Sequence, residues 1–172
     1  MKTAWLSVAL VAAVIMVAGG QAPPDPRLQA QLKQLFPSAT TFTPKDGNPP
    51  HFKALEGALP TLLGYAFWTT EVEPLERGYD GPIKILVGLD TKGVLTDIIV
   101  VEHHEPYGSF SVEPPQFARQ FKGKSIREPF KVGEDIDEVS RASITILSAT
   151  RAIRNSSRRI ARAYLAPPDA GK

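Results

Sequence analysis

The most regular alternation of hydrophobic and polar residues in the chain lies between residues 83 and 105. Its first half has an apolar side chain at every second position, at Ile83, Ile85, Val87 and Leu89. A period of two is typical of a β-strand with one buried face. A short turn that contains glycine, residues 91–93, then leads into a second apolar run. This pattern predicts an antiparallel β-hairpin.

Two further strands and two short helices are predicted around the hairpin. Residues 51–55 and 62–72 read as strands, and the second is rich in aromatic residues, which favour strands. Residues 25–39 carry apolar side chains at helical spacing up to Pro37, so we expect a helix that ends there. Residues 114–121 suit a short helix, because proline is favoured in a first helical turn.

The longest periodic segment runs from Val139 to about Tyr164. Its apolar residues recur at helical spacing and define one face of an amphipathic helix: Val139, Ala142, Ile146, Ala149, Ile153, Ile160 and Tyr164. The chain is therefore expected to be a single α/β (α+β) domain, in which an antiparallel sheet packs against a long C-terminal amphipathic helix.

The first 22 residues have the layout of a secretory signal peptide, with a basic start, an apolar run and small residues before two prolines. We expect cleavage near Pro23 and a mature domain, residues 23–165, on the periplasmic or extracytoplasmic side. The alternative is an uncleaved N-terminal membrane anchor, because the apolar run is near the ~17 residues that span a bilayer. Residues 166–172 are predicted to be a disordered tail.

Composition excludes several functions. The formal charge of +2 gives no indication of nucleic-acid binding. The chain has no cysteine, which excludes disulfides, iron–sulfur clusters and thiol catalysis by its own residues. Its three histidines offer no credible nucleophile and base pair for a hydrolase. A metal site formed by residues 102–105 is not expected either, because alternate residues of a strand point to opposite faces.

Residues 137–145 are the strongest candidate for a functional site, because hydroxyl and small residues lie there at the start of the predicted long helix. A helix start offers unpaired backbone N–H groups and the positive end of the helix dipole, and both stabilise a phosphate. A hydroxyl here, above all that of Ser143, is well placed to carry or contact a phosphate. The commoner role of such a run is a plain N-cap, and Ser140 suits that role best.

This stretch is similar to the attachment motif of the FMN-binding domain family, Asp-x-x-Ser/Thr-Gly-Ala-Thr/Ser-x-Thr. Asp137, Ser140, Ala142, Ser143 and Thr145 match the motif, whereas Arg141 stands where the family usually has glycine. The order of other motifs resembles the periplasmic flavin domain of NosR/NirI-type proteins of anaerobic respiration and, more distantly, the RnfG and NqrC flavin subunits. These motifs are residues 35–39, 63–66, 78–83, 86–90, 93 and 102–106.

The resemblance implies FMN as the cofactor, joined through a phosphoester to Ser143. The other motif residues, Asp137, Ser140, Arg141, Ala142 and Thr145, would belong to the cofactor-binding site. His104, Glu105 and Pro106 would lie near the flavin at a strand end. Thr145 lies on the other flank of the apolar stripe, but this geometry does not exclude it as the attachment residue, so the choice of Ser143 rests mainly on the motif alignment.

The role implied by the resemblance is electron transfer, so we expect a carrier rather than an enzyme with its own substrate. A flavin transferase and a membrane or periplasmic electron-transfer partner are implied as well. The alternative is a flavin-free sensory or binding module of the same fold. Arg141 bears on this choice, because arginine lacks the backbone freedom of glycine but can form a charge-assisted bond to a phosphate.

Overall fold

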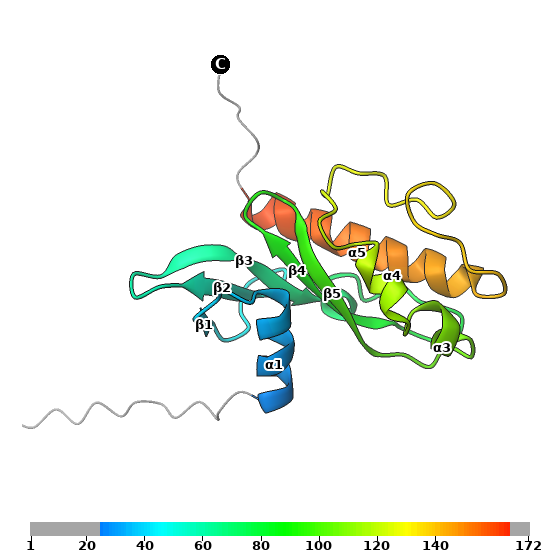
Figure 1. Cartoon of the computed structure of the whole chain (residues 1–172), viewed down its shortest axis with the longest axis horizontal. Coiled ribbons are helices and arrows are strands. Elements are labelled where there is room, and N and C mark those ends of the chain that lie inside the picture. The colour runs from blue at the N-terminus through cyan, green and yellow to red at the C-terminus, as the bar shows by residue number, and fades with distance from the viewer. Residues whose placement is uncertain (1–24, 166–172) are drawn as a thin grey trace, which may run out of the picture.

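The computed structural model describes residues 25–165, so the predicted leader and the predicted tail lie outside the described residues. The elements follow one another as Figure 1 shows, with these bounds: α1 Pro26–Leu35, β1 Thr41–Phe42, β2 Phe52–Glu56, β3 Thr61–Trp68, α2 Thr69–Val72, β4 Lys84–Asp90, β5 Leu95–Glu102, α3 Gly108–Ser111, α4 Pro115–Arg119 and α5 Ser143–Tyr164.

The strands form one antiparallel sheet of five strands in the order β1-β2-β3-β4-β5, so each strand pairs with its neighbours in sequence. The predicted hairpin is confirmed as β4 and β5, with Val87 opposite Ile98. The carboxylate of Asp90 closes its turn by accepting the backbone N–H groups of Lys92 and Val94, each at 2.8 Å. The predicted fold class, an antiparallel sheet with a long C-terminal helix, is confirmed.

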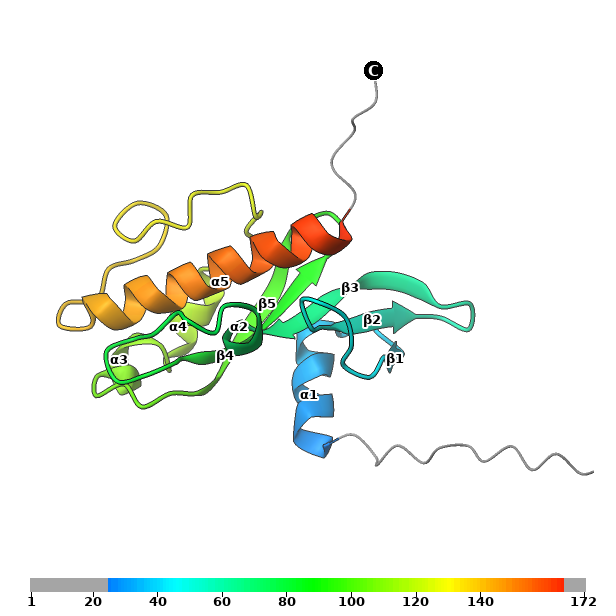
Figure 2. The same ribbon diagram turned by 180° about the vertical axis from the view of Figure 1, so that it is seen from behind.

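The two faces of the sheet are covered by different helices (Figures 1 and 2). Alternate residues of β4 separate accordingly: Ile85 and Val87 belong to the core beneath α5, while Leu86 belongs to the core beneath α1. On α5 the buried residues include Ile146 and Ile153, as the helical pattern predicted. Among residues 25–165, no helix is both long enough and apolar enough to cross a membrane.

Strand β3 ends earlier than the sequence suggested. It stops at Trp68, and the chain turns into the short helix α2 instead of continuing as a strand to Val72. The buried hydroxyl of Thr69 explains the turn, because it donates to the carbonyl of Ile83 and accepts the N–H of Ile85, both at 3.1 Å. This side chain pairs with backbone groups at the start of β4 and fixes the corner.

Helix α5 also begins later than predicted, at Ser143 instead of Val139. Arg141 has a φ of +70°, in the left-handed region, which cannot continue a right-handed helix. The predicted end of the helix near Tyr164 is confirmed.

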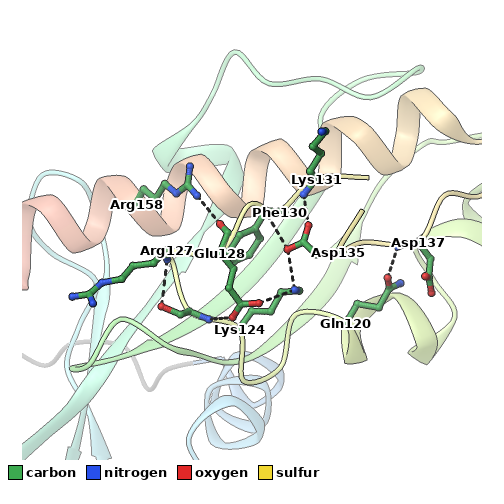
Figure 3. Close-up of polar contacts among 10 residues, drawn as sticks. Gln120, Lys124, Arg127, Glu128, Phe130, Lys131, Asp135, Asp137 and Arg158 are labelled. Carbon is green, nitrogen blue, oxygen red and sulfur yellow. Dashed lines mark hydrogen bonds and ion pairs between the residues drawn. The ribbon is translucent and has the colours of Figure 1, made fainter. Parts of the chain in front are cut away.

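A long connection, residues 120–142, runs over α5 before the chain enters it (Figures 1 and 2). Lys124 holds this connection together, because its ammonium lies 3.0 Å from the carboxylates of both Glu128 and Asp135 (Figure 3). Arg158 of α5 donates to the carbonyls of Ile126 and Glu128 at 2.9 and 2.8 Å. These contacts fix the path by which the chain reaches residues 137–145.

Candidate functional site

The start of α5 is the part of the candidate site that the motif predicted. Ser143 is the first helical residue and follows the N-cap residue Ala142, which is buried with 3% of its surface exposed. Alanine has no side-chain acceptor, and no side chain among residues 25–165 caps this helix. The first turn also contains no acidic residue. Backbone N–H groups at such an uncapped start are suited to an anion.

The structure distinguishes the three hydroxyl residues of the motif. Ser140 is exposed in the turn before α5 and does not form the N-cap, so its predicted capping role is wrong. Thr145 is buried, with 2% of its surface exposed, and donates its hydroxyl hydrogen to Glu105. Ser143 is half-buried, and its Oγ lies 3.5 Å from an oxygen of Glu138, at the limit of a hydrogen bond. Of the two motif hydroxyls that lie within α5, that of Ser143 is therefore the accessible one.

Glu105 is buried and connects three segments of the chain. Its carboxylate accepts the backbone N–H groups of Tyr79 and Asp80 at 3.0 and 2.9 Å, together with the hydroxyl of Thr145. Burial alone would raise the pKa of Glu105, but the three hydrogen bonds and the nearby His103 lower it below its ordinary value. Glu105 is therefore an ionised anchor, whose oxygens are bound to protein groups.

Gly78 allows the loop before β4 to pass close over this carboxylate. A Cβ at position 78 would overlap Oε1 of Glu105, and the Glu105 carboxylate is held in place by three donors. The side chain of His103 also contacts Glu105, through its backbone. Its Nδ1 accepts the backbone N–H of Glu105 at 3.1 Å, and its Nε2 lies 3.2 Å from Glu113. The segment after β5 is thus bound into the same network.

The other predicted site residues lie at the surface around this network. Asp137 and Arg141 are exposed in the loop before α5, and His104 and Pro106 are exposed on either side of Glu105. No cluster of three potential metal ligands occurs within residues 25–165. The structure therefore brings Thr145 and Glu105 into contact, whereas Asp137, Ser140, Arg141, His104 and Pro106 are exposed.

Exposed apolar side chains gather around the same helix start. Seven large hydrophobic side chains are exposed among residues 25–165, and six of them lie on the loop before β4, on the segment that contains α3, or on the first turns of α5. We call these six the apolar rim: Leu75, Tyr79, Tyr107, Phe110, Ile144 and Leu147.

Polar contacts bring the three segments of the apolar rim together. The Glu105 carboxylate joins the backbone of Tyr79 to Thr145 of α5. Arg151, one turn after Leu147, pairs with Glu76 at 2.7 Å beside Leu75. Both ribbon views show the loop before β4 and helix α3 beside the N-terminal half of α5 (Figures 1 and 2). A patch of this kind is typical of a surface that binds a ligand or a partner.

Sequence comparison agrees with this geometry. Residues 78–157, which include the Glu105 network and the start of α5, match the FMN-binding domain family. The chain is 25% identical over 141 residues to the regulatory protein NosR of Pseudomonas aeruginosa, a match that covers 76% of this chain and 19% of NosR. It is 32% identical over 130 residues to the RnfG protein of the ion-translocating oxidoreductase complex of Haemophilus influenzae, covering 70% of this chain and 53% of RnfG.

Residues 78–157 thus match the family that the sequence motifs predicted, and this match indicates FMN as the cofactor. The chain spans about half of the RnfG relative and about a fifth of NosR.

The donor set at the start of α5 fits the phosphate of FMN. An accessible hydroxyl precedes uncapped backbone N–H groups, and the first turn carries no carboxylate. The apolar rim also offers aromatic and aliphatic surface to a flat ring system. The residues present therefore suit both ends of the FMN molecule.

Sequence reasoning alone missed the backbone donors of Tyr79 and Asp80 and the central place of Glu105. The available signal was Gly78, the first residue of the motif at 78–83. The sequence shows this motif but not that its backbone binds Glu105. The apolar rim was missed too, because its members lie far apart in the sequence and only the fold brings them together.

Proposed function

We propose that this protein is an extracytoplasmic flavoprotein that carries FMN on Ser143 through a phosphoester and transfers electrons between other proteins. The observation that carries the proposal is the position of the Ser143 hydroxyl, at the uncapped start of α5 within a matched FMN-binding domain. Bound FMN would supply the redox chemistry. The residues of the chain would hold the phosphate, orient the ring and restrict water around it.

Each group of the site has a definite task in this proposal. The hydroxyl of Ser143 provides the point of attachment, and the N–H groups of the first turn of α5 stabilise the charge of the phosphate. The apolar rim excludes water from one side of the flavin. Glu105 does not need to touch the cofactor, because it fixes the loop before β4 against α5 and so keeps the rim assembled.

Attachment requires an activated FMN donor and an enzyme that delivers it, so we propose a flavin transferase as a maturation partner. A phosphorus–oxygen bond forms to Oγ of Ser143 as the donor releases its leaving group, and the hydroxyl proton passes to a base. The carboxylate of Glu138 lies 3.5 Å from this oxygen and is exposed. The transferase therefore meets a hydroxyl at the surface of the folded domain.

Electron transfer is supported by the names of the relatives, one of which belongs to an ion-translocating oxidoreductase complex. We propose a membrane or periplasmic redox partner and no substrate of the protein's own. Location outside the cytoplasm is supported by the layout of residues 1–22. N-terminal sequencing of the native protein should place the mature start at or near Pro23, and an intact Met1 on a soluble cytoplasmic product would contradict export.

Mass spectrometry tests the attachment directly. The chain should be produced in an exporting host with and without a flavin transferase, and the denatured product examined for flavin fluorescence and for the mass of one FMN phosphoester. Ser143→Ala should abolish both signals, whereas Ser143→Thr should retain them. Ser140→Ala is a matched control at an exposed hydroxyl of the same motif and should retain both.

The flavin-free alternative makes the opposite prediction. It gained support from the arginine that replaces glycine in the motif, yet Arg141 adopts the left-handed conformation that glycine would provide. The replacement therefore leaves the turn before Ser143 in place. If wild-type protein matured beside its own transferase carries no tightly bound flavin, the carrier proposal fails and the flavin-free module replaces it.

A further inference from the structure

Arg141 occupies a backbone conformation that is unfavourable for its residue type. Its φ of +70° lies in the left-handed region, where a residue with a Cβ is less stable by roughly 1–2 kcal/mol than in the right-handed region. Within residues 25–165, two residues other than glycine have a positive φ, Arg141 and Phe130. Phe130 is buried in the core. Arg141 is exposed, so core packing does not account for its conformation.

The guanidinium of Arg141 makes no hydrogen bond or ion pair with any group in residues 25–165, whereas several arginines of α5 do. Arg151 pairs with Glu76, Arg158 donates to two backbone carbonyls, and Arg159 donates to the carbonyl of Val72 at 2.7 Å. Arg141 thus has neither a packing role nor a polar partner in this part of the chain. Its exposed guanidinium is therefore free to bind a ligand.

The position of this side chain indicates which ligand that is. Arg141 precedes the N-cap residue of α5 and stands two positions before Ser143, so its long side chain can reach groups attached to the Ser143 oxygen. Glycine, which the motif usually has here, would satisfy the same backbone at no steric cost. The side chain is therefore the feature that this chain adds to the motif.

We propose that Arg141 binds the phosphate of FMN attached to Ser143, an inference that rests on the proposed function. The phosphodiester has two non-bridging oxygens. The N–H groups at the start of α5 donate to it from the helix side, and the guanidinium donates from the loop side. A charge-assisted and bidentate pair of this kind is stronger than a neutral hydrogen bond, and arginine forms it better than lysine.

The contact between Arg141 and the phosphate would also offset negative charge near the attachment point. Asp137 and Glu138 are exposed carboxylates in the same loop, and Glu138 lies 3.5 Å from the Ser143 hydroxyl. A phosphate placed there meets their negative charge. Arg141 offsets this repulsion next to the attachment point, and no other basic residue lies between positions 132 and 150.

The test compares thermal unfolding of the protein with and without attached flavin, in wild type, Arg141→Gln and Arg141→Lys. If Arg141 binds the phosphate, the gain in Tm on attachment should be smaller in Arg141→Gln by about 3 °C or more, and Arg141→Lys should restore part of it. The wild-type gain should also shrink with added salt, and the gain of Arg141→Gln should change less.

A purely structural role would change both forms equally and leave the gain unaltered. An equal gain in wild type and Arg141→Gln would therefore overturn the inference, provided that mass spectrometry shows one FMN on each protein. Absence of FMN from the wild-type protein matured with its transferase would instead contradict the proposed function itself. The two failures are thus distinguishable by the mass of the protein.

Discussion

Thr145, in the first turn of α5, donates its hydroxyl hydrogen to the carboxylate of Glu105, which lies forty residues earlier in the chain. The same carboxylate accepts two backbone N–H groups from the loop before β4. One buried anion therefore joins the beginning of the long helix, the end of β5 and a loop that carries part of the apolar rim. This junction holds the start of α5, where Ser143 lies, against the segment after β5 and the loop before β4.

Substitution of the two nearby hydroxyl residues should give opposite results. Thr145→Val keeps the branched shape but removes the donor to a buried carboxylate, and should lower the free energy of unfolding by about 1.5–3 kcal/mol. Flavin should remain attached. Ser143→Ala removes a half-buried hydroxyl with a marginal hydrogen bond, and should abolish attachment with little effect on unfolding of the flavin-free chain.

Chemical denaturation and the intact mass of each variant check this pair. Loss of flavin in Thr145→Val together with retention in Ser143→Ala would move the attachment point to Thr145.

Glu105→Gln should make the protein less sensitive to acid. The folded-state pKa of Glu105 lies below its ordinary value, so the ionised carboxylate contributes stability at neutral pH. That contribution is fully present above the ordinary pKa and is lost as the pH falls through the folded pKa. The glutamine variant should therefore have a lower Tm at pH 7 and a shallower decline of Tm with acidification.

A suitable control is Glu113→Gln, since the Glu113 side chain is 54% exposed beside His103. Its Tm at pH 7 should stay near that of the wild type. Parallel pH profiles for wild type and Glu105→Gln would show that Glu105 does not carry the predicted acid sensitivity.

Lys124→Met should loosen the connection that leads into the attachment motif. Burial alone would lower the pKa of Lys124, but hydrogen bonds and charge from Asp135 and Glu128 raise it above its ordinary value. Removal of the cation leaves these carboxylates without their shared partner, which should cost about 1–3 kcal/mol of unfolding free energy.

Urea denaturation measures the effect of Lys124→Met. The matched control is Lys131→Met, which removes the surface ion pair with Glu134 and should have no measurable effect, because such exposed pairs contribute little. Equal effects of the two substitutions would mean that the Lys124 contacts shown in Figure 3 do not stabilise the connection.

Arg141→Gly should stabilise the flavin-free chain. Relief of the left-handed arginine should outweigh the greater freedom of glycine in the unfolded state, for a net gain of up to about 1 kcal/mol. The measurement is Tm in the absence of a flavin transferase. A lower Tm for the glycine variant would show that the side chain of Arg141 stabilises the folded apo protein, contrary to its lack of partners within residues 25–165.

Much of the fold was predictable because its signals are local. The alternation of Ile85 and Val87 identified the central hairpin, and the spacing of Ile146 and Ile153 identified the core face of α5. The start of α5 was placed four residues too early, because the apolar spacing continues back through Ala142 to Val139. Nothing in the sequence shows that Arg141 breaks the helix by adopting a positive φ.

The candidate site was predictable only where its residues follow one another. Residues 137–145 form a recognisable motif, whereas the Glu105 network joins residues that are distant in the sequence. The sequence indicated that Glu105 belongs to the site. Its orientation toward backbone N–H groups is a consequence of tertiary structure, which brings the loop at Gly78 across the end of β5.

The apolar rim also affects the solubility of the chain before FMN is attached. Six exposed hydrophobic side chains at one end of the domain form an adhesive surface, suited to self-association and to capture by chaperones. A flavin seated there would cover part of that surface. Chains without flavin would then be the aggregation-prone form, and cofactor attachment would act as a step of quality control as well as a source of redox activity.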